Sequence, residues 1–368
     1  MINKVLKESL SEKTNSEKKI NKVLEDPLKE KNVLPLFAKK LFINHFSPSQ
    51  FTKPDAAWLI EYVWMDQQTR RRVLIPNAAM SGGIAVGNVL QNCLADTIWK
   101  LNSSKKLSPV KWTKLKKDES LQEELEKFKD YEPNSEKDRT KHIKYLEEYP
   151  SVVSNGFKAL EEIGVVLPIT CENQISITSD MIGNFFICSL PVVGRCDFVF
   201  GDNSVFGNTP HELKPTSQAD AFPQKIIELK TKWSRLGKVK KNGDRSFIKA
   251  PAPATPSFYH LVQCSTYAAY YQFKVPVYLV YATEQDYKVF TSNNCPGLTV
   301  EGLKKNFQIM MNVFRRRERI LATNEDKTRE EIIQGAIELM DPMFDHPWCW
   351  NNYPTDVLQE IKAMWRMV

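Results

Sequence analysis

Two acidic residues and a lysine lie in two predicted strands, and together they could catalyse a hydrolysis. Asp197 falls within the β-branched and aromatic stretch GRCDFVFG, and Glu228 and Lys230 fall within KIIELKTKW. Because side chains alternate along a strand, Glu228 and Lys230 point to the same face of the sheet. Two carboxylates can hold Mg²⁺ or Mn²⁺, which lowers the pKa of a bound water until hydroxide is available near neutral pH. A neighbouring lysine offsets charge in the transition state, so the set suits phosphodiester hydrolysis.

The tripeptide E-x-K is a weak signal by itself, because it occurs five times in the chain. Only the copy at 228–230 is preceded by apolar residues typical of a strand, Ile226 and Ile227. We therefore favour this copy as the catalytic one. The copy at 212–214 stays an alternative, since the adjacent His211 could serve as a rival metal ligand. The remaining interpretation is that residues 228–230 form the solvated side of a strand and have no catalytic role.

A helix motif accompanies these acids. Gln263 and Tyr267 are four residues apart on a predicted helix over 256–272, so they share one face. Upstream, FSPSQF (46–51) precedes one predicted helix and MSGGIAVGNVLQ (80–91) opens another. In this order the motifs resemble the PD-(D/E)XK nuclease superfamily, in the RecB-like branch that includes lambda-type phage exonucleases, CRISPR-associated adaptation exonucleases and the mitochondrial genome-maintenance exonuclease. The resemblance covers about residues 44 to 290.

The resemblance implies a role for each motif residue. Asp197 and Glu228 would be the metal-binding acids, and Lys230 would be the catalytic lysine. Gln263 and Tyr267 would line the active site. The implied cofactor is Mg²⁺ or Mn²⁺, and the implied fold is α/β, with a restriction-endonuclease-like core in which helices flank a mixed central sheet.

The first core helix departs from the family pattern. Gly83 would open this helix, and the family normally has a histidine metal ligand four residues further on and an acid four residues after that. The chain has Gly87 and Gln91 at these two positions. Asn88, Gln91 or a water is therefore expected as a substitute ligand, or the metal site is weaker than in relatives.

Cysteine spacing and missing motifs exclude other cofactors. The chain has seven cysteines and no C-x-x-C pair, so we expect neither a zinc ribbon nor an iron–sulfur cluster. It has no P-loop and no Rossmann glycine pattern, so we expect no nucleotide cofactor.

Basic residues are concentrated in a few segments. The whole chain carries 51 Lys plus Arg against 44 Asp plus Glu, a formal net charge of +7. Basic clusters bind phosphate oxygens, and aromatic rings stack on unpaired bases. Although basic runs are often only solvated faces, we expect DNA contact directly after the catalytic strand, at Lys232, Trp233, Lys238, Lys240 and Lys241.

The composition and hydrophobic periodicity of the chain predict three regions. Residues 1–32 read as a charged arm or frayed helix, 33–325 as the nuclease domain with its catalytic core at about 150–290, and 326–368 as a helical extension. Separate helices are expected over 135–148 and 151–163, strands over 174–180 and 184–190, and a long loop after residue 233.

These observations predict a metal-dependent DNA exonuclease that acts in DNA replication, recombination, repair or degradation. A phage gene is one source that fits this prediction. Its expected partners are single-stranded DNA, frayed or duplex ends, and proteins of replication or recombination. A sequence- or structure-specific endonuclease, and a non-catalytic DNA-binding protein on a degenerate nuclease fold, stay as alternatives. No membrane span or signal peptide is evident, so we expect a cytoplasmic protein of a bacterial or phage-infected cell, with a mitochondrial location left open. The preference for single- or double-stranded DNA, the direction of cleavage along the DNA and the oligomeric state stay open.

Overall fold

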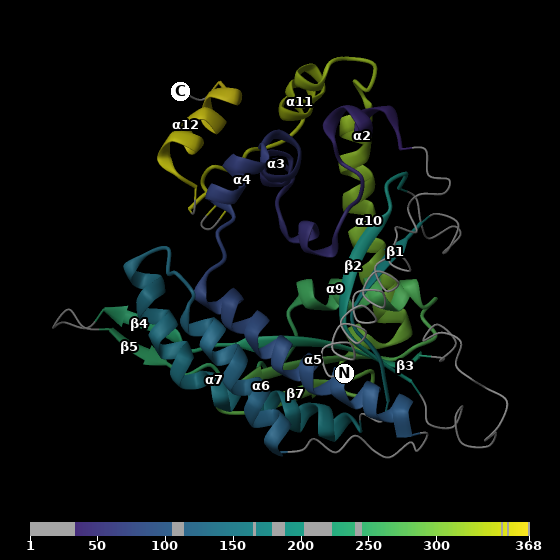
Figure 1. Ribbon diagram of the computed structural model, residues 1–368. Coiled ribbons are helices and arrows are strands. Elements are labelled where there is room, and N and C mark those ends of the chain that lie inside the picture. The colour runs from purple at the N-terminus through teal and green to yellow at the C-terminus, as the bar shows by residue number, and fades with distance from the viewer. Residues whose placement is uncertain are drawn as a thin grey trace, which may run out of the picture. The chain divides into compact units, whose positions relative to one another are not determined.

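A five-stranded mixed sheet carries the candidate residues in the computed structural model (Figure 1). Its strands lie in the order β1-β2-β3-β6-β7, and only the central pair, β3 and β6, is parallel. The strand bounds are Leu167–Ile177 (β1), Val192–Gly201 (β2), Pro223–Lys232 (β3), Val277–Thr283 (β6) and Tyr287–Phe290 (β7). The structure describes residues 34–104, 114–164, 167–178, 188–201, 223–239, 245–346, 349–351 and 353–366.

Helices cover both faces of this sheet. On one face α5 (Ala78–Ser104), α6 (Lys114–Lys129) and α7 (Glu136–Ile163) pack side by side, as Figure 1 shows. On the other face α9 (Phe258–Tyr270) packs against the strands, and α10 (Val300–Ala322) packs against α9. Central strands buried on both faces are apolar on both sides, which explains the run Ile226, Ile227 and Leu229 in β3. The expected α/β class, with helices flanking a mixed sheet, is confirmed.

Helix α7 is longer than the sequence predicts. We expected a break near Pro150, because an interior proline removes a backbone hydrogen bond and clashes with the preceding turn. The helix instead runs through Pro150 from its N-cap at Ser135 to Gly164, which takes the left-handed conformation with φ 70°. Tyr149 and Val152 on either side are fully buried, so core packing outweighs the cost of the proline.

One loop prediction and one strand prediction need correction. The segment after Trp233 is not one long loop, because β4 (Arg235–Val239) and β5 (Arg245–Ile248) pair as an antiparallel hairpin. The expected strand over 184–190 lies partly outside the described residues. At its described end, the backbone N–H of Ser189 donates to the Glu318 carboxylate of α10 at 2.9 Å, so a side chain takes the place of a strand partner.

The remaining described helices are α2 (Leu36–Leu41), η1 (Pro48–Thr52), α3 (Asp55–Leu59), η2 (Ile60–Trp64), α4 (Gln67–Val73), η6 (Pro296–Leu298), α11 (Arg329–Glu338) and α12 (Thr355–Met364). Of these, α2, η1, η6 and α11 pack against α10. Buried Arg317 of α10 ties η1 and α3 to it: its guanidinium donates to the Asp55 carboxylate at 2.9 Å and to the Gln50 carbonyl at 3.0 Å. By its contacts the chain from Leu36 to Val368 is one unit, so the helices after residue 325 belong to the same unit as the sheet.

The predicted arm at 1–32 lies outside the described residues. Within the part of the chain that the structure describes, no single helix is both long and apolar enough to cross a membrane. One bent pair, α4 with the first part of α5, meets that criterion by length and composition alone, with a bend of 97°.

Candidate active site

Asp197 lies beside Glu228 because a side chain replaces a backbone partner between β2 and β3. The ladder between these strands runs from Gly201↔Pro223 to Phe198↔Ile227. Beyond that pair, the backbone N–H of Leu229 donates to Oδ2 of Asp197 at 2.7 Å. Since Leu229 stands between Glu228 and Lys230 in the chain, this bond holds the Asp197 carboxylate against the E-x-K segment.

Glu228 and Lys230 form a buried ion pair on one face of β3. Glu228 is fully buried, and its Oε1 accepts a hydrogen bond from Nζ of Lys230. The other carboxylate oxygen, Oε2, is buried without a hydrogen-bond partner. The Lys230 side chain keeps 23% of its surface exposed. The alternation predicted from the sequence is therefore present, and it brings these two side chains together.

The charge of each of these three groups depends on its two neighbours. Burial, and then the charge of Glu228, raise the pKa of the Asp197 carboxyl well above its usual range, while Lys230 opposes that rise. Burial alone would lower the pKa of Lys230, but the charges of Glu228 and Asp197 outweigh burial and raise it. The raised pKa favours the protonated form of Asp197, and an additional cation bound beside it would favour the ionised form.

Gln263 and Tyr267 of α9 position the strand that carries Asp197. Nε2 of Gln263 donates to the Tyr267 hydroxyl at 2.6 Å, and that hydroxyl donates to the backbone carbonyl of Arg195 at 2.7 Å. Tyr267 is fully buried, and a Cβ placed on Gly194 would lie 3.4 Å from its ring. The predicted helix motif is thus beside the acids, and it contacts β2 two residues before Asp197.

His260 and Tyr281 complete the surroundings of Lys230; of these two, the sequence offered only His260, which stands three residues before Gln263 on the same predicted helix and could touch the site or have a structural role. Tyr281 is the β6 partner of Lys230, and its hydroxyl lies 2.6 Å from Nδ1 of His260. Burial, and then the positive charge of Lys230, lower the pKa of His260 to about 4, so the imidazole is neutral at pH 7. The register between β3 and β6 sets this contact, and a parallel register across a helical crossover cannot be read from local sequence.

The expected metal contacts on α5 are placed differently. Nδ2 of Asn88 donates to Oε2 of Glu124 at 2.8 Å, which directs Asn88 toward α6. Gln91 is half-buried on α5. A Cβ on Gly83 would lie 2.9 Å from Oγ1 of Thr231, so this turn of α5 packs on the face of β3 opposite Lys230. Gly87, at the position where the resemblance expects a histidine, has no neighbour within 4 Å of such a Cβ.

Trp233 is not the DNA-stacking residue that we expected. It is 7% exposed and lies in the core between α5 and α7, with its ring 5.1 Å from Tyr145 and 6.3 Å from Phe128. Strand alternation explains this, because residue 233 shares the face of Ile227 and Leu229. Of the other expected DNA contacts, Lys232 and Lys238 are exposed, whereas Lys240 and Lys241 lie outside the described residues.

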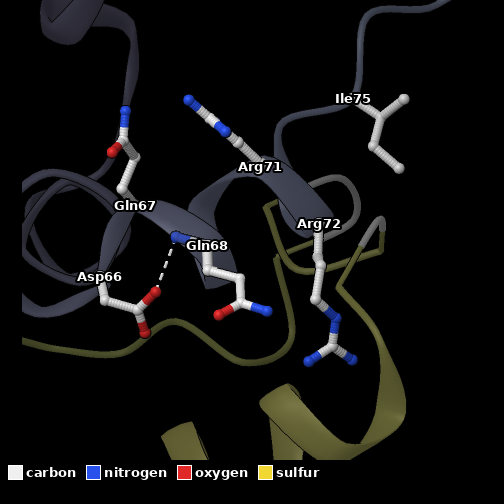
Figure 2. A pocket seen from close by; sticks show the side chains of 6 residues that line it. All are labelled: Asp66, Gln67, Gln68, Arg71, Arg72 and Ile75. Atoms are coloured by element: carbon white, nitrogen blue, oxygen red, sulfur yellow. Dashed lines mark hydrogen bonds between the residues drawn. The ribbon is translucent and has the colours of Figure 1, made fainter.

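A surface cavity of about 810 Å³ lies at α4, lined by residues between Asp66 and Ile75 (Figure 2). Two of its polar side chains have structural partners. Asp66 caps α4 by accepting from the backbone N–H of Gln68 at 2.7 Å, the bond dashed in Figure 2, and Arg72 donates to Asp356 of α12 at 2.8 Å. None of the predicted catalytic residues lines this cavity.

The Asp197 and Glu228 donors fit a magnesium or manganese ion. Mg²⁺ typically takes one or two protein carboxylates and fills its other positions with water and substrate phosphate. The partnerless Oε2 of Glu228 is an acceptor of the kind such an ion needs. Among the described residues, no group of three or more His, Cys, Asp or Glu side chains could hold a metal, so an ion at this site would rely on these two carboxylates. Compared with known proteins, the sequence matches no family model and no curated protein.

Proposed function

We propose that the protein is a metal-dependent deoxyribonuclease of the PD-(D/E)XK type, most active as an exonuclease. The observation that carries the proposal is the bond from the Leu229 N–H to Asp197, which holds a second carboxylate beside the buried Glu228–Lys230 pair. The resemblance is supported by the order of the residues along two neighbouring strands, Asp197, Glu228 and Lys230. It is also supported by Gln263 and Tyr267 on the adjacent helix. The implied roles are in replication, recombination, repair or degradation of DNA.

Each residue has a separate task in this proposal. Asp197 and Glu228 bind Mg²⁺ or Mn²⁺, and a bound ion would polarise the phosphodiester and supply hydroxide from one of its waters. Lys230, partly exposed and charged, contacts a phosphate oxygen and offsets the charge that develops there. Gln263 and Tyr267 are positioning residues, because they hold the backbone of β2 before Asp197.

Cleavage of three DNA substrates tests the proposal. End-labelled single strands, end-labelled linear duplexes and closed circular plasmid are incubated with Mg²⁺, with Mn²⁺ or with a chelator. We expect metal-dependent loss of label from linear DNA, with closed circles intact. Cleavage of closed circles would instead show the endonuclease alternative. Absence of cleavage with either metal would overturn the proposal.

One observation favours the non-catalytic alternative. The space beside Gly87 is open, and the proposed metal donors are two carboxylates. A third protein ligand is therefore not found among the described residues. A DNA-binding protein on this fold would bind DNA in a salt-dependent manner and cleave none of the three substrates. The same assay therefore separates the two functions.

A further inference from the structure

Three aromatic side chains form an exposed cluster at the start of α9. Phe258 and Tyr259 are 43% and 44% exposed, and the Phe51 ring of η1 lies 6.0 Å from Phe258 and 6.2 Å from Tyr259. These contacts are edge-on, with interplanar angles of 65° and 62°, so the rings are not stacked on one another. A single exposed apolar residue is ordinary, whereas a contiguous group marks an interaction site.

The cluster is connected to the candidate active site from two sides. Tyr259 is followed directly by His260, and the backbone N–H of Ser257 donates to the hydroxyl of Tyr281, the strand partner of Lys230, at 3.1 Å. On the other side, Phe51 belongs to the same short helix as Pro48, whose ring lies 3.6 Å from a Cβ placed on Gly194. Gly194 precedes Asp197 in β2. Both routes lead from the cluster to residues that adjoin the candidate active site.

Two lysines and one acid hold the segment that leads into the cluster, and the backbone N–H of Ala252 donates to the Asp286 carboxylate at 2.8 Å. Nζ of Lys232 donates to the Pro251 carbonyl at 3.3 Å, and Nζ of Lys288 donates to the Ala254 carbonyl at 3.1 Å. Each of these two ammonium groups donates to a neutral carbonyl, and a hydrogen bond to a carbonyl does not neutralise its charge. Apolar rings flanked by lysines fit unpaired nucleotides, whose bases stack on aromatic rings while their phosphates pair with cations. A purely apolar protein partner would not use those lysines.

We propose that Phe51, Phe258 and Tyr259 form a stacking surface for unpaired bases next to the scissile phosphate. The inference rests on the proposed function, and it names the substrate class as single-stranded DNA or a frayed end. A paired base in a blunt duplex is stacked on its neighbours and must be unpaired before it can reach these rings. The surface therefore gives a preference for single strands.

Equilibrium binding of the full-length protein tests this surface apart from catalysis. A fluorescein-labelled oligothymidylate and a blunt duplex are titrated in Ca²⁺, with cleavage in Mg²⁺ measured in parallel. The variants are Phe258→Ala, Tyr259→Ala and the ring-preserving Tyr259→Phe. Phe42→Ala serves as the control, because Phe42 is 86% exposed and lies outside the cluster. Thermal unfolding of each variant checks that it folds.

We expect each alanine variant to bind oligothymidylate at least about 5-fold more weakly, with Tyr259→Phe and Phe42→Ala like the wild type. Unchanged single-strand binding in folded alanine variants would overturn the inference even if DNA is cleaved, and so would a wild type that does not bind single strands. Ring-dependent binding without cleavage would support the inference and contradict only the nuclease proposal. A change in oligomeric state without a change in DNA binding would show that the rings contact a second copy instead.

Discussion

The backbone N–H of Leu229 donates to the Asp197 carboxylate at 2.7 Å, and so a side chain of β2 is held by the residue between Glu228 and Lys230 in β3. The bond brings two carboxylates together against electrostatic repulsion, which burial increases. A site built in this way should be less stable than its neutral variants and should bind divalent cations.

The first prediction concerns Asp197→Asn. The amide oxygen can still accept from Leu229, and the repulsion with Glu228 is removed, so the free energy of unfolding should equal or exceed that of the wild type. Mn²⁺ binding, measured by calorimetry, should weaken at least about tenfold because a charged ligand is lost. Undiminished Mn²⁺ affinity in this variant would show that Asp197 is not a ligand.

The second prediction compares two glycines within α5. A Cβ at Gly82 would lie 2.8 Å from the Trp233 ring and 2.9 Å from the Phe128 ring, whereas one at Gly87 would meet nothing within 4 Å. Gly87→Ala should therefore raise the free energy of unfolding by about 0.5 to 1 kcal/mol, since glycine costs backbone entropy in a helix. Gly82→Ala should lower it by about 1 to 3 kcal/mol. Urea denaturation measures both, and equal effects would contradict this packing.

The third prediction concerns Trp233→Ala. Removing a buried ring between α5 and α7 should cost about 3 to 5 kcal/mol of stability. Because the indole does not face solvent, the DNA affinity of the folded fraction should stay unchanged. Filter binding at a temperature well below the unfolding midpoint checks this. A large loss of affinity with little loss of stability would return Trp233 to the DNA surface.

The fourth prediction is a pH dependence that arises from His260. Its pKa is lowered from 6.5 to about 4 by burial and by Lys230, and its ring contacts the Tyr281 hydroxyl. Between these two pH values the unfolded chain binds a proton that the folded chain does not, so stability is lost as the pH falls from 6.5 to about 4.

Removing this histidine should make the decline shallower. His260→Gln should lose about 1 to 2 kcal/mol less than the wild type across that window, after allowance for the partial exposure of the ring. Chemical denaturation at a series of pH values tests it. The two proteins should show parallel curves above pH 7, and parallel curves below pH 6.5 as well would contradict the prediction.

Alternation along strands predicted the pairing of Glu228 with Lys230, and two adjacent strands suffice to bring Asp197 to them. The same alternation places Trp233 with Ile227 and Leu229 on the core face, so its burial was available from the sequence. The lysines next to Trp233 led us to expect DNA stacking there, and that interpretation was wrong. Alternation thus predicts the two faces of β3 well when it is followed to the end of the strand.

Other features depend on contacts between distant segments. Helix α7 continues through Pro150 because Tyr149 and Val152 pack in the core, and no local signal reports that packing. The contact of His260 with Tyr281 depends on the register of β6 against β3, which the crossover through α9 sets. The N-terminal arm and the E-x-K copy at 212–214 lie outside the described residues, so those interpretations stay predictions.

Single-turnover cleavage by Lys230→Ala and Lys225→Ala tests the central claim most directly. Both lysines lie on β3, but Nζ of Lys225 donates to the Ile163 carbonyl at 2.7 Å at the end of α7, whereas Lys230 pairs with Glu228. With Mg²⁺ and end-labelled single-stranded DNA, Lys230→Ala should cut at least about 100-fold more slowly than the wild type, and Lys225→Ala should cut at the wild-type rate. Equal rates for Lys230→Ala and the wild type would contradict an active site at Asp197, Glu228 and Lys230.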